Sequence, residues 1–429
     1  MLRYGIIALI AAIIAVTMFV QVSVAEEPTE EWKFSTNTYV TASPVYLNNM
    51  LYVGAQNGKM YFMSTLTGTP QGIPFVTHNQ TPSAIKGTPL VVNDQSTNRR
   101  IVYFGSDQGT LFSVNGLTGK EIWKYQADAP IDGTPALYNG ILFFGTFDNK
   151  VYALLAEDGQ FQWNFSAEGW ISDGIELKDN YVFFGSQDGN LYCLEVYSGK
   201  LKWKTDLKSR VNAPIIDGDI IYVGTQDGYL HAVDRFSGNE QWTFKTDGAI
   251  VSKPLVQLNT VYIGSADGNV YALNETTGKL VWKFPTRDGV KATPGFDSGI
   301  LYIGSGDGNV YAVDARMGLE YWKYNVGNAV DTTPTAGIGT DKKTHLYFAT
   351  VNGNVYSLKL PSTLIMATPT PKPKPTEAPT TVISPTVKVT PTLVPLPSIS
   401  PTPQSSWCPL PGLFAAALAV VGIVYRRRR

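Results

Sequence analysis

The sequence predicts an all-β fold, an eight-bladed β-propeller of four-stranded blades. The first observation is the stretch VYIGSADGNVYAL, from Val261 to Leu273, which recurs as LYIGSGDGNVYAV from Leu301 and as IYVGTQDGYLHAV from Ile221. The second is the spacing of its copies, which is 51, 40, 40, 39, 40, 40 and 45 residues. Internal periods near 40 residues, with four strands in each, are typical of propeller blades. The copies are marked, where their first strand meets the turn, by Gly54, Gly105, Gly145, Gly185, Gly224, Gly264, Gly304 and Ala349.

Each repeat contains the elements of one blade. Two short apolar runs flank Asp267-Gly268, a pair that favours a tight hairpin because Gly accepts a positive φ without steric cost. A strand marked by Pro precedes the hairpin, as in TPLVV from Thr88, and a Gly turn such as Thr277-Gly278-Lys279 follows it. The last strand contains a Trp, which we expect to pack between adjacent blades. These tryptophans are Trp123, Trp163, Trp203, Trp242, Trp282 and Trp322.

The two ends of the repeat region predict how the ring closes. The eighth copy ends at NVYSLKL, from Asn354 to Leu360, and no Trp strand follows it. Near the N-terminus, Trp32-Lys33-Phe34 matches Trp282-Lys283-Phe284 of a complete repeat. We therefore expect the N-terminal strand to complete the last blade, which leaves no open blade edge. This places the propeller at residues 26–361.

The segments outside the propeller predict export and attachment to a membrane. Residues 1–25 resemble a signal peptide that is cleaved after Ala25, and the alternative is an uncleaved membrane anchor. Residues 362–406 contain 11 Pro and 10 Thr, so they predict a disordered, semi-rigid linker. Residues 407–429 contain a short apolar run followed by four Arg, which indicates a C-terminal membrane anchor or sorting signal. We expect the propeller to lie outside the cell, at its surface.

The repeats resemble the PQQ-type β-propeller repeat family. The matching motifs are the YxGSxDGxxYAL hairpin, the TGK turn and the closing Trp-Lys-Phe or Trp-Lys-Tyr, over about 330 residues. The family includes quinoprotein alcohol dehydrogenases and the periplasmic outer-membrane assembly lipoprotein of the Bam type. The resemblance implies the fold, and it is weak evidence for function because one fold serves many functions.

The C-terminus looks like an archaeal PGF-type surface sorting signal. The similar features are the Thr- and Pro-rich stretch, Pro411-Gly412, a short apolar segment and a basic tail. Leu413 stands where Phe is usual in that signal. The resemblance implies export and attachment to the cell surface.

The sequence offers little support for a cofactor or a metal. The resemblance implies that a quinoprotein dehydrogenase would have adjacent cysteines, a calcium site and a catalytic Asp. Here the two Cys, Cys193 and Cys408, are far apart, and Cys193 is expected to be a small buried residue. The three His, at 78, 231 and 345, lack metal-ligand spacing. The Asp-Gly pairs are expected to form turns and not calcium sites, so we expect neither PQQ nor calcium.

The charge distribution argues against nucleic acid as a partner. The repeat region contains 26 basic and 34 acidic residues, a formal net charge of about −8. We expect a monomeric binding or protein-interaction scaffold, whose partner is a protein or a carbohydrate at the cell surface. The alternative is a PQQ-dependent oxidoreductase-like enzyme that uses the central mouth of the propeller.

The candidate binding residues precede the first strands of the blades, since these strands lie nearest the axis and their leading loops surround one mouth. Trp170 stands out, because within the repeats it is the one Trp outside the closing strands, and Gly174-Ile175 replaces the usual Thr-Pro after it. An aromatic side chain beside mixed charges suits a sugar, a peptide or a flat ligand. The alternative is that Trp170 only plugs the channel or covers a blade end. The charged candidates are Lys86, Asp132, Asp173, Arg210, Lys253, Lys291 and Asp331.

Overall fold

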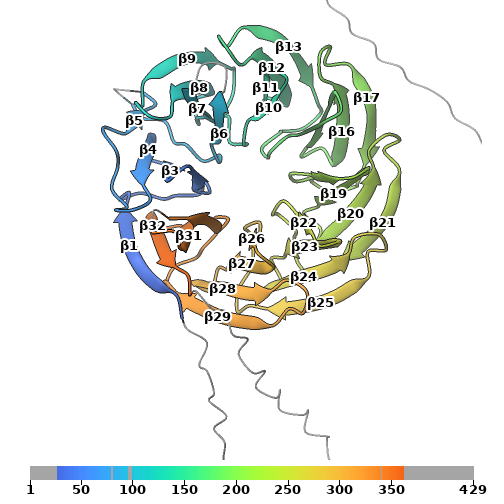
Figure 1. The fold of residues 1–429 in the computed structure, drawn as a ribbon. Helices are drawn as coiled ribbons and strands as arrows, with labels where there is room; N and C mark the ends of the chain where they lie inside the picture. The colour runs from blue at the N-terminus through green and yellow to red at the C-terminus, as the bar shows by residue number, and fades with distance from the viewer. Residues whose placement is uncertain (1–26, 79–80, 95–98, 340, 362–429) are drawn as a thin grey trace, which may run out of the picture. The chain divides into compact units, whose positions relative to one another are not determined.

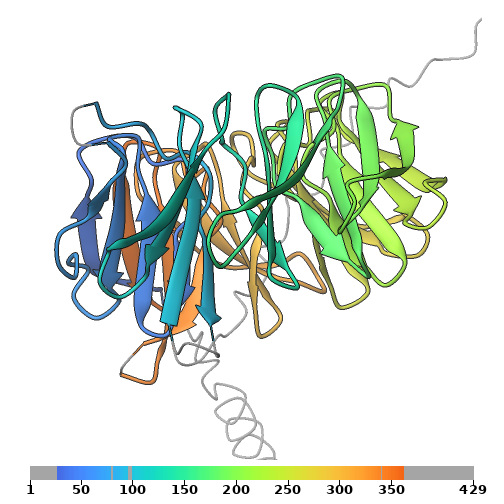
Figure 2. The same cartoon turned by 90° about the horizontal axis from the view of Figure 1, so that it is seen from above.

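The computed structural model describes residues 27–361, except 79–80, 95–98 and 340. The expected signal peptide, linker and C-terminal anchor lie outside the described residues. Within them the chain forms 32 strands in eight four-stranded antiparallel sheets. The sheets follow one another around a central axis (Figures 1 and 2), which confirms the eight-bladed propeller. Among these residues no helix has the length and hydropathy to cross a membrane.

The first four blades follow the chain in order. Blade 1 consists of β2 (Val45–Leu47), β3 (Met50–Gly54), β4 (Lys59–Ser64) and β5 (Phe75–Val76), and blade 2 of β6 (Leu90–Asp94), β7 (Arg99–Gly105), β8 (Thr110–Asn115) and β9 (Glu121–Gln126). Blade 3 consists of β10 (Ala136–Tyr138), β11 (Ile141–Gly145), β12 (Lys150–Leu155) and β13 (Phe161–Ser166), and blade 4 of β14 (Glu176–Lys178), β15 (Tyr181–Gly185), β16 (Asn190–Glu195) and β17 (Leu201–Asp206).

The last four blades complete the ring. Blade 5 consists of β18 (Ile215–Asp217), β19 (Ile220–Gly224), β20 (Tyr229–Asp234) and β21 (Glu240–Lys245), and blade 6 of β22 (Leu255–Gln257), β23 (Thr260–Gly264), β24 (Asn269–Asn274) and β25 (Leu280–Pro285). Blade 7 consists of β26 (Gly295–Asp297), β27 (Ile300–Gly304), β28 (Asn309–Asp314) and β29 (Glu320–Asn325), and blade 8 of β30 (Thr335–Ile338), β31 (Thr344–Ala349), β32 (Asn354–Lys359) and β1 (Thr29–Ser35).

The position of a strand within its blade decides which of its residues are buried. The two middle strands are packed between neighbouring sheets on both faces, so β27 is buried at every position. The outermost strands alternate between more exposed and less exposed residues, as in β21. The first strands of neighbouring blades contact one another around the axis, as β10 and β14 do. The core is therefore a series of clusters between blades.

The repeated Trp joins each blade to the next, as the sequence predicts. Trp242 of blade 5 donates a hydrogen bond from Nε1 to the carbonyl of Glu275 in blade 6, over 3.1 Å. Its ring covers Gly278 so closely that an added Cβ would lie 2.5 Å from Trp242. Gly278 has a φ of +65°, so this position needs glycine both for its backbone and for the space.

Blade 1 packs against blade 2 without a Trp in its last strand. In a complete blade a small residue pairs with the Trp, as Ala272 does with Trp282. The residue at the matching place in blade 1 is Phe62, which is 2% exposed and fills the space with its own ring. Ile73 stands where the Trp would be, two residues before Phe75, and is 88% exposed. The Phe62 ring in the third strand of blade 1 therefore takes the place of the Trp that other blades have in their fourth strand.

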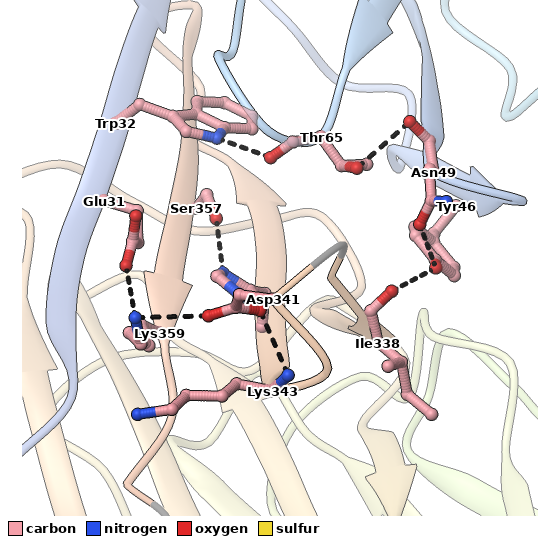
Figure 3. Close-up of polar contacts among 11 residues, drawn as sticks. Glu31, Trp32, Tyr46, Asn49, Thr65, Ile338, Asp341, Lys343, Ser357 and Lys359 are labelled. Atoms are coloured by element: carbon pink, nitrogen blue, oxygen red, sulfur yellow. Dashed lines mark hydrogen bonds and ion pairs between the residues drawn. The ribbon is translucent and has the colours of Figure 1, made fainter.

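The N-terminal strand closes the ring, which confirms the prediction. β1 pairs antiparallel with β32, and Trp32 lies opposite Ser357. Trp32 then reaches blade 1, where its Nε1 donates to the carbonyl of Thr65 over 2.8 Å (Figure 3). Lys359 of β32 forms ion pairs with Glu31, at 3.1 Å, and with Asp341, at 3.2 Å. Closure thus combines a strand ladder, an indole hydrogen bond and a charge cluster.

Candidate binding site at the channel mouth

The loops that lead into the first strands are held in the same way in successive blades. A buried aliphatic residue in each loop donates its backbone N–H to a carbonyl in the hairpin turn of the preceding blade. Ile171 does so to Thr146 over 3.2 Å, and Val290 to Ser265 over 3.0 Å. Both side chains are fully buried. The residues that follow this anchor then turn toward the axis, and we call this end of the channel the mouth.

The channel holds a cavity of about 810 Å³ that is lined by six of the eight candidate residues. These six are Lys86, Asp132, Asp173, Lys253, Lys291 and Asp331. Arg210 and Trp170 are not among the lining residues. Both directly precede the buried anchor of their loop, as the hydrogen bonds of Ile171 and Val211 to the preceding blade show. They therefore lie further out on the mouth than the residues that line the cavity.

The lining residues do not share one structural position. Lys86, Asp132, Lys291 and Asp331 directly follow the anchor of their loop, and they come from blades 2, 3, 7 and 8. Asp173 follows its anchor by two residues and Lys253 by three. The charged residues that line the cavity therefore stand one, two or three residues after the anchor of their loop.

Ion pairs between blades connect the charges of the mouth. Lys86 lies 2.7 Å from Asp107 of the hairpin turn in its own blade and 3.6 Å from Asp132 of blade 3. Lys291 of blade 7 lies 3.5 Å from Asp331 of blade 8. The cavity is therefore lined by charged side chains of both signs that form ion pairs with one another. Such a lining suits polar ligands that have both hydrogen-bond donors and acceptors.

One ion pair reaches across an intervening blade. Lys253 of blade 6 is paired with Glu176 of blade 4. The loop of blade 5 between them offers the small Ala213 to the cavity. Glu176 is a lining residue that the sequence did not single out, because it lies within β14 and its partner comes from a loop 77 residues away.

Asp132 and Asp173 are perturbed carboxyls of the lining. Burial raises the pKa of Asp132 to about 6, with the Asp107 carboxylate adding to the rise and Lys86 opposing it. Burial likewise raises the pKa of Asp173, and Arg210 opposes this rise. A carboxyl that titrates near neutral pH in a concave site marks the mouth as a candidate functional site.

Trp170 forms an aromatic pair with Phe147 at the seam of blades 3 and 4. Their ring centroids are 5.2 Å apart, and the rings are within 7° of parallel. Trp170 is 49% exposed, so it is not a core residue between blades. Phe147 was not predicted as a site residue. Its signal in the sequence is a large aromatic residue in a hairpin turn where other repeats have Gln226 or Ala266.

The residues considered for metal or cofactor chemistry have structural surroundings. Cys193 is 1% exposed in β16, where it pairs with Trp203 as the small residue of its blade, and burial raises its pKa to about 12. Nδ1 of the buried His231 lies 2.6 Å from Glu240. Asp267 accepts hydrogen bonds from the Asn269 N–H and the Tyr271 hydroxyl in its turn. In the described part of the chain no group of three or more His, Cys, Asp or Glu has a metal-binding arrangement.

Two features of the lining bear on PQQ, a flat anionic ring system. A site for it needs an aromatic face to stack on and cations that are free to meet its carboxylates. Tyr46 is the only aromatic side chain among the lining residues that the structure describes. The lining lysines Lys86, Lys253 and Lys291 all form ion pairs with carboxylates of the chain itself.

Comparisons with known proteins agree with this fold. The family described as outer membrane protein assembly factor BamB matches residues 86–169, 166–285 and 266–359. Together these matches cover more than half of the 429 residues. No curated protein matches the chain in sequence.

Solved structures of similar architecture come from proteins of different kinds. BamB from Moraxella catarrhalis is 17% identical, covers 78% of this chain and 100% of its own, and gives a TM-score of 0.63. The quinohemoprotein alcohol dehydrogenase from Comamonas testosteroni is 14% identical, with coverages of 81% and 78% and a TM-score of 0.62. Sqt1 from Saccharomyces cerevisiae is 16% identical, with coverages of 78% and 100% and a TM-score of 0.67. At such identities the similarity extends to the fold alone.

Proposed function

Because this chain belongs to the PQQ-type repeat family described as outer membrane protein assembly factor BamB, we propose that it is an exported, surface-anchored propeller that works as a binding scaffold. Propellers of this fold serve as scaffolds or as PQQ dehydrogenases, so the fold alone does not choose between them. The partner binds at the mouth, and it is a protein or a carbohydrate of the cell surface. The protein acts as a monomer and needs no cofactor.

The observation that carries the proposal is the network of ion pairs between blades at the mouth. The pair Lys291–Asp331 joins loops of two blades, and Lys253–Glu176 joins a loop of blade 6 to strand β14 of blade 4, so both hold different blades in one arrangement. Binding to such a rigid surface costs little conformational entropy. The positive and negative side chains of the mouth then favour a polar partner over an apolar small molecule.

The terminal segments support the proposed location. The apolar run within residues 1–25 has the composition of a signal peptide, and residues 362–429 combine a Pro- and Thr-rich stalk with an apolar segment and four Arg. The resemblance of this C-terminus to the archaeal sorting signal points to the same place.

Binding at the mouth is tested with the full-length protein and its native cell envelope. The double variant Lys253→Ala and Glu176→Ala removes the ion pair that reaches across blade 5, and it should weaken partner capture severalfold. The control is Lys200→Ala in the turn between β16 and β17, at the opposite end of the blade, which should capture the partner normally. Equal capture by both variants would rule out the mouth.

Surface display is tested with protease on intact cells. A soluble fragment that ends between Ser362 and Ser406 should be released. A protein that is protected in intact cells and cut only after lysis would contradict export. Addition of PQQ and calcium to the purified protein should produce no bound-cofactor absorbance, and a stoichiometric absorbance would favour the enzyme instead.

A further inference from the structure

The strongest unassigned feature of the mouth is the exposed aromatic pair of Trp170 and Phe147. Phe147 stacks on one face of the indole, with the rings 5.2 Å apart and nearly parallel. Trp170 nevertheless remains 49% exposed. With centroids 5.2 Å apart, the nearly parallel rings are offset, so Phe147 covers only part of the indole. The result is a flat aromatic surface backed by a second ring.

Backbone hydrogen bonds on both sides hold this aromatic pair in place. The Gln187 N–H donates to the Trp170 carbonyl over 2.9 Å, and the Phe147 N–H donates to the Pro130 carbonyl over 3.1 Å. The next residue, Ile171, is fully buried and bonded to Thr146. The platform therefore exists before any ligand arrives, which reduces the entropic cost of binding.

Polar side chains of both signs follow Trp170 along its loop and meet Arg210 of the next blade. Ser172 and Asp173 follow Trp170 on the same loop and line the cavity. Arg210 occupies in blade 5 the place that Trp170 occupies in blade 4, because the carbonyls of both accept the N–H of a hairpin residue. Its Nη2 donates to the Ser172 hydroxyl over 3.1 Å and lies 3.5 Å from Asp173 Oδ2. The group thus combines a hydroxyl, a carboxylate and a guanidinium.

We propose that this platform binds one pyranose ring of a neutral carbohydrate, stacked on Trp170, with Ser172, Asp173 and Arg210 contacting its hydroxyls. The inference rests on the proposed scaffold function and names its ligand class. The aliphatic face of a pyranose offers C–H groups to an indole, and its rim offers hydroxyls that both donate and accept. The site supplies a flat apolar face and a polar rim with groups of both kinds.

The charge of the site selects a neutral sugar over an anionic one. The Arg210 guanidinium is already paired with Asp173, so it offers no uncompensated positive charge to a carboxylate or phosphate. The negative net charge of the repeat region also opposes anionic ligands. A peptide in a polyproline conformation stacks on aromatic surfaces as well, so it is included in the test as the competing occupant.

Isothermal titration calorimetry of the full-length protein tests the inference. The probes are neutral gluco-, manno- and galacto-oligosaccharides, an oligogalacturonate as the anionic counterpart, and a synthetic peptide of residues 362–406. At least one neutral oligosaccharide should bind. Trp170→Ala should lower its affinity about tenfold or more, as the loss of an aromatic anchor does, and Arg210→Ala should lower it to a similar extent.

Tyr39→Ala is the matched control. Tyr39 occupies the same place in blade 1, since Gln56 N–H donates to its carbonyl over 3.0 Å, and it is 59% exposed. This variant should bind like the wild type. Trp170→Ala should also melt within about 2 °C of the wild type, as expected for an exposed residue. Phe147→Ala provides a second variant that loosens the platform while leaving Trp170 in place.

The inference is overturned if no neutral oligosaccharide binds, or if Trp170→Ala and Phe147→Ala both bind as well as the wild type. It is also overturned if the anionic sugar or the peptide binds through Trp170 in their place. If partner capture from the cell envelope still depends on Lys253 and Glu176, the scaffold function stands without the sugar site. If that capture is also unaffected, both proposals fail.

Discussion

The indole Nε1 of Trp32 and the carbonyl of Thr65 are 2.8 Å apart. Trp32 belongs to the first strand of the chain, which completes blade 8, and Thr65 lies just after β4 of blade 1. Gly68 in the same turn would place an added Cβ 2.4 Å from the Trp32 ring. One residue near the N-terminus therefore joins the last blade to the first. It repeats the indole hydrogen bond between consecutive blades that Trp123, Trp163, Trp203, Trp242 and Trp282 make.

Loss of this contact should destabilise the closed ring. Trp32→Ala removes a partly buried indole and its hydrogen bond, so the free energy of unfolding should fall by about 2–4 kcal/mol. Thr29→Ala, at an exposed position of the same strand, should change it by less than about 0.5 kcal/mol. Chemical denaturation measures both. Equal unfolding midpoints for the two variants would show that Trp32 does not secure the closure.

Phe62 should be the most sensitive residue of blade 1. Phe62→Ala leaves a cavity where other blades have a Trp, and it should cost about 3–5 kcal/mol. The control is Phe161→Ala in β13, whose side chain is 45% exposed, and it should cost less than about 1 kcal/mol. If thermal unfolding shows similar losses for both, Phe62 does not fill the place of the missing Trp.

Two glycines separate the cost of a positive φ from the cost of a steric clash. Gly140 has a φ of +78° and open space where an added Cβ would lie, whereas an added Cβ at Gly278 would lie 2.5 Å from Trp242. Gly140→Ala should cost about 1–2 kcal/mol from the backbone alone. Gly278→Ala should cost about 1–3 kcal/mol more, because Trp242 must move as well. Equal denaturation midpoints for Gly140→Ala and Gly278→Ala would mean that Trp242 moves aside without a cost in stability.

The raised pKa of Asp132 predicts a pH dependence of stability. Its pKa is about 6 in the folded protein and 3.8 ordinarily, so between these values the folded state holds a proton that the unfolded state releases. This contribution to stability is present below about pH 4 and is lost as the pH rises through 6. Asn at this position does not ionise, so Asp132→Asn does not lose stability in this way. Its free energy of unfolding relative to the wild type should therefore rise by on the order of 2 kcal/mol between pH 4 and pH 7.

The matched control for this titration is Thr41→Val. Thr41 follows the buried residue Val40 in the loop of blade 1, as Asp132 follows its own anchor, and it does not titrate. Its stability relative to the wild type should be the same at both pH values. A constant difference for Asp132→Asn as well would show that this carboxyl does not titrate near pH 6.

The repeats were sufficient to predict the blades and their closure. A hairpin signal such as Asp267-Gly268 and a Trp such as Trp282 act over short distances along the chain. The strands of a blade can therefore be predicted from the residues of one repeat. The match of Trp32-Lys33-Phe34 to a complete repeat likewise needed only a comparison of residues. The packing role of Phe62 was not predicted, because it depends on the absence of a Trp from the neighbouring strand.

The sequence by itself thus determined the fold class, the number of blades and the residue that closes the ring, because these follow from local pattern and spacing. Only the tertiary structure decided which side chains meet at the mouth. It paired Trp170 with Phe147, Lys253 with Glu176 and Arg210 with Asp173. The physical reason is that such contacts join different blades, and a shift of one or two residues relative to the buried anchor changes where each loop side chain points.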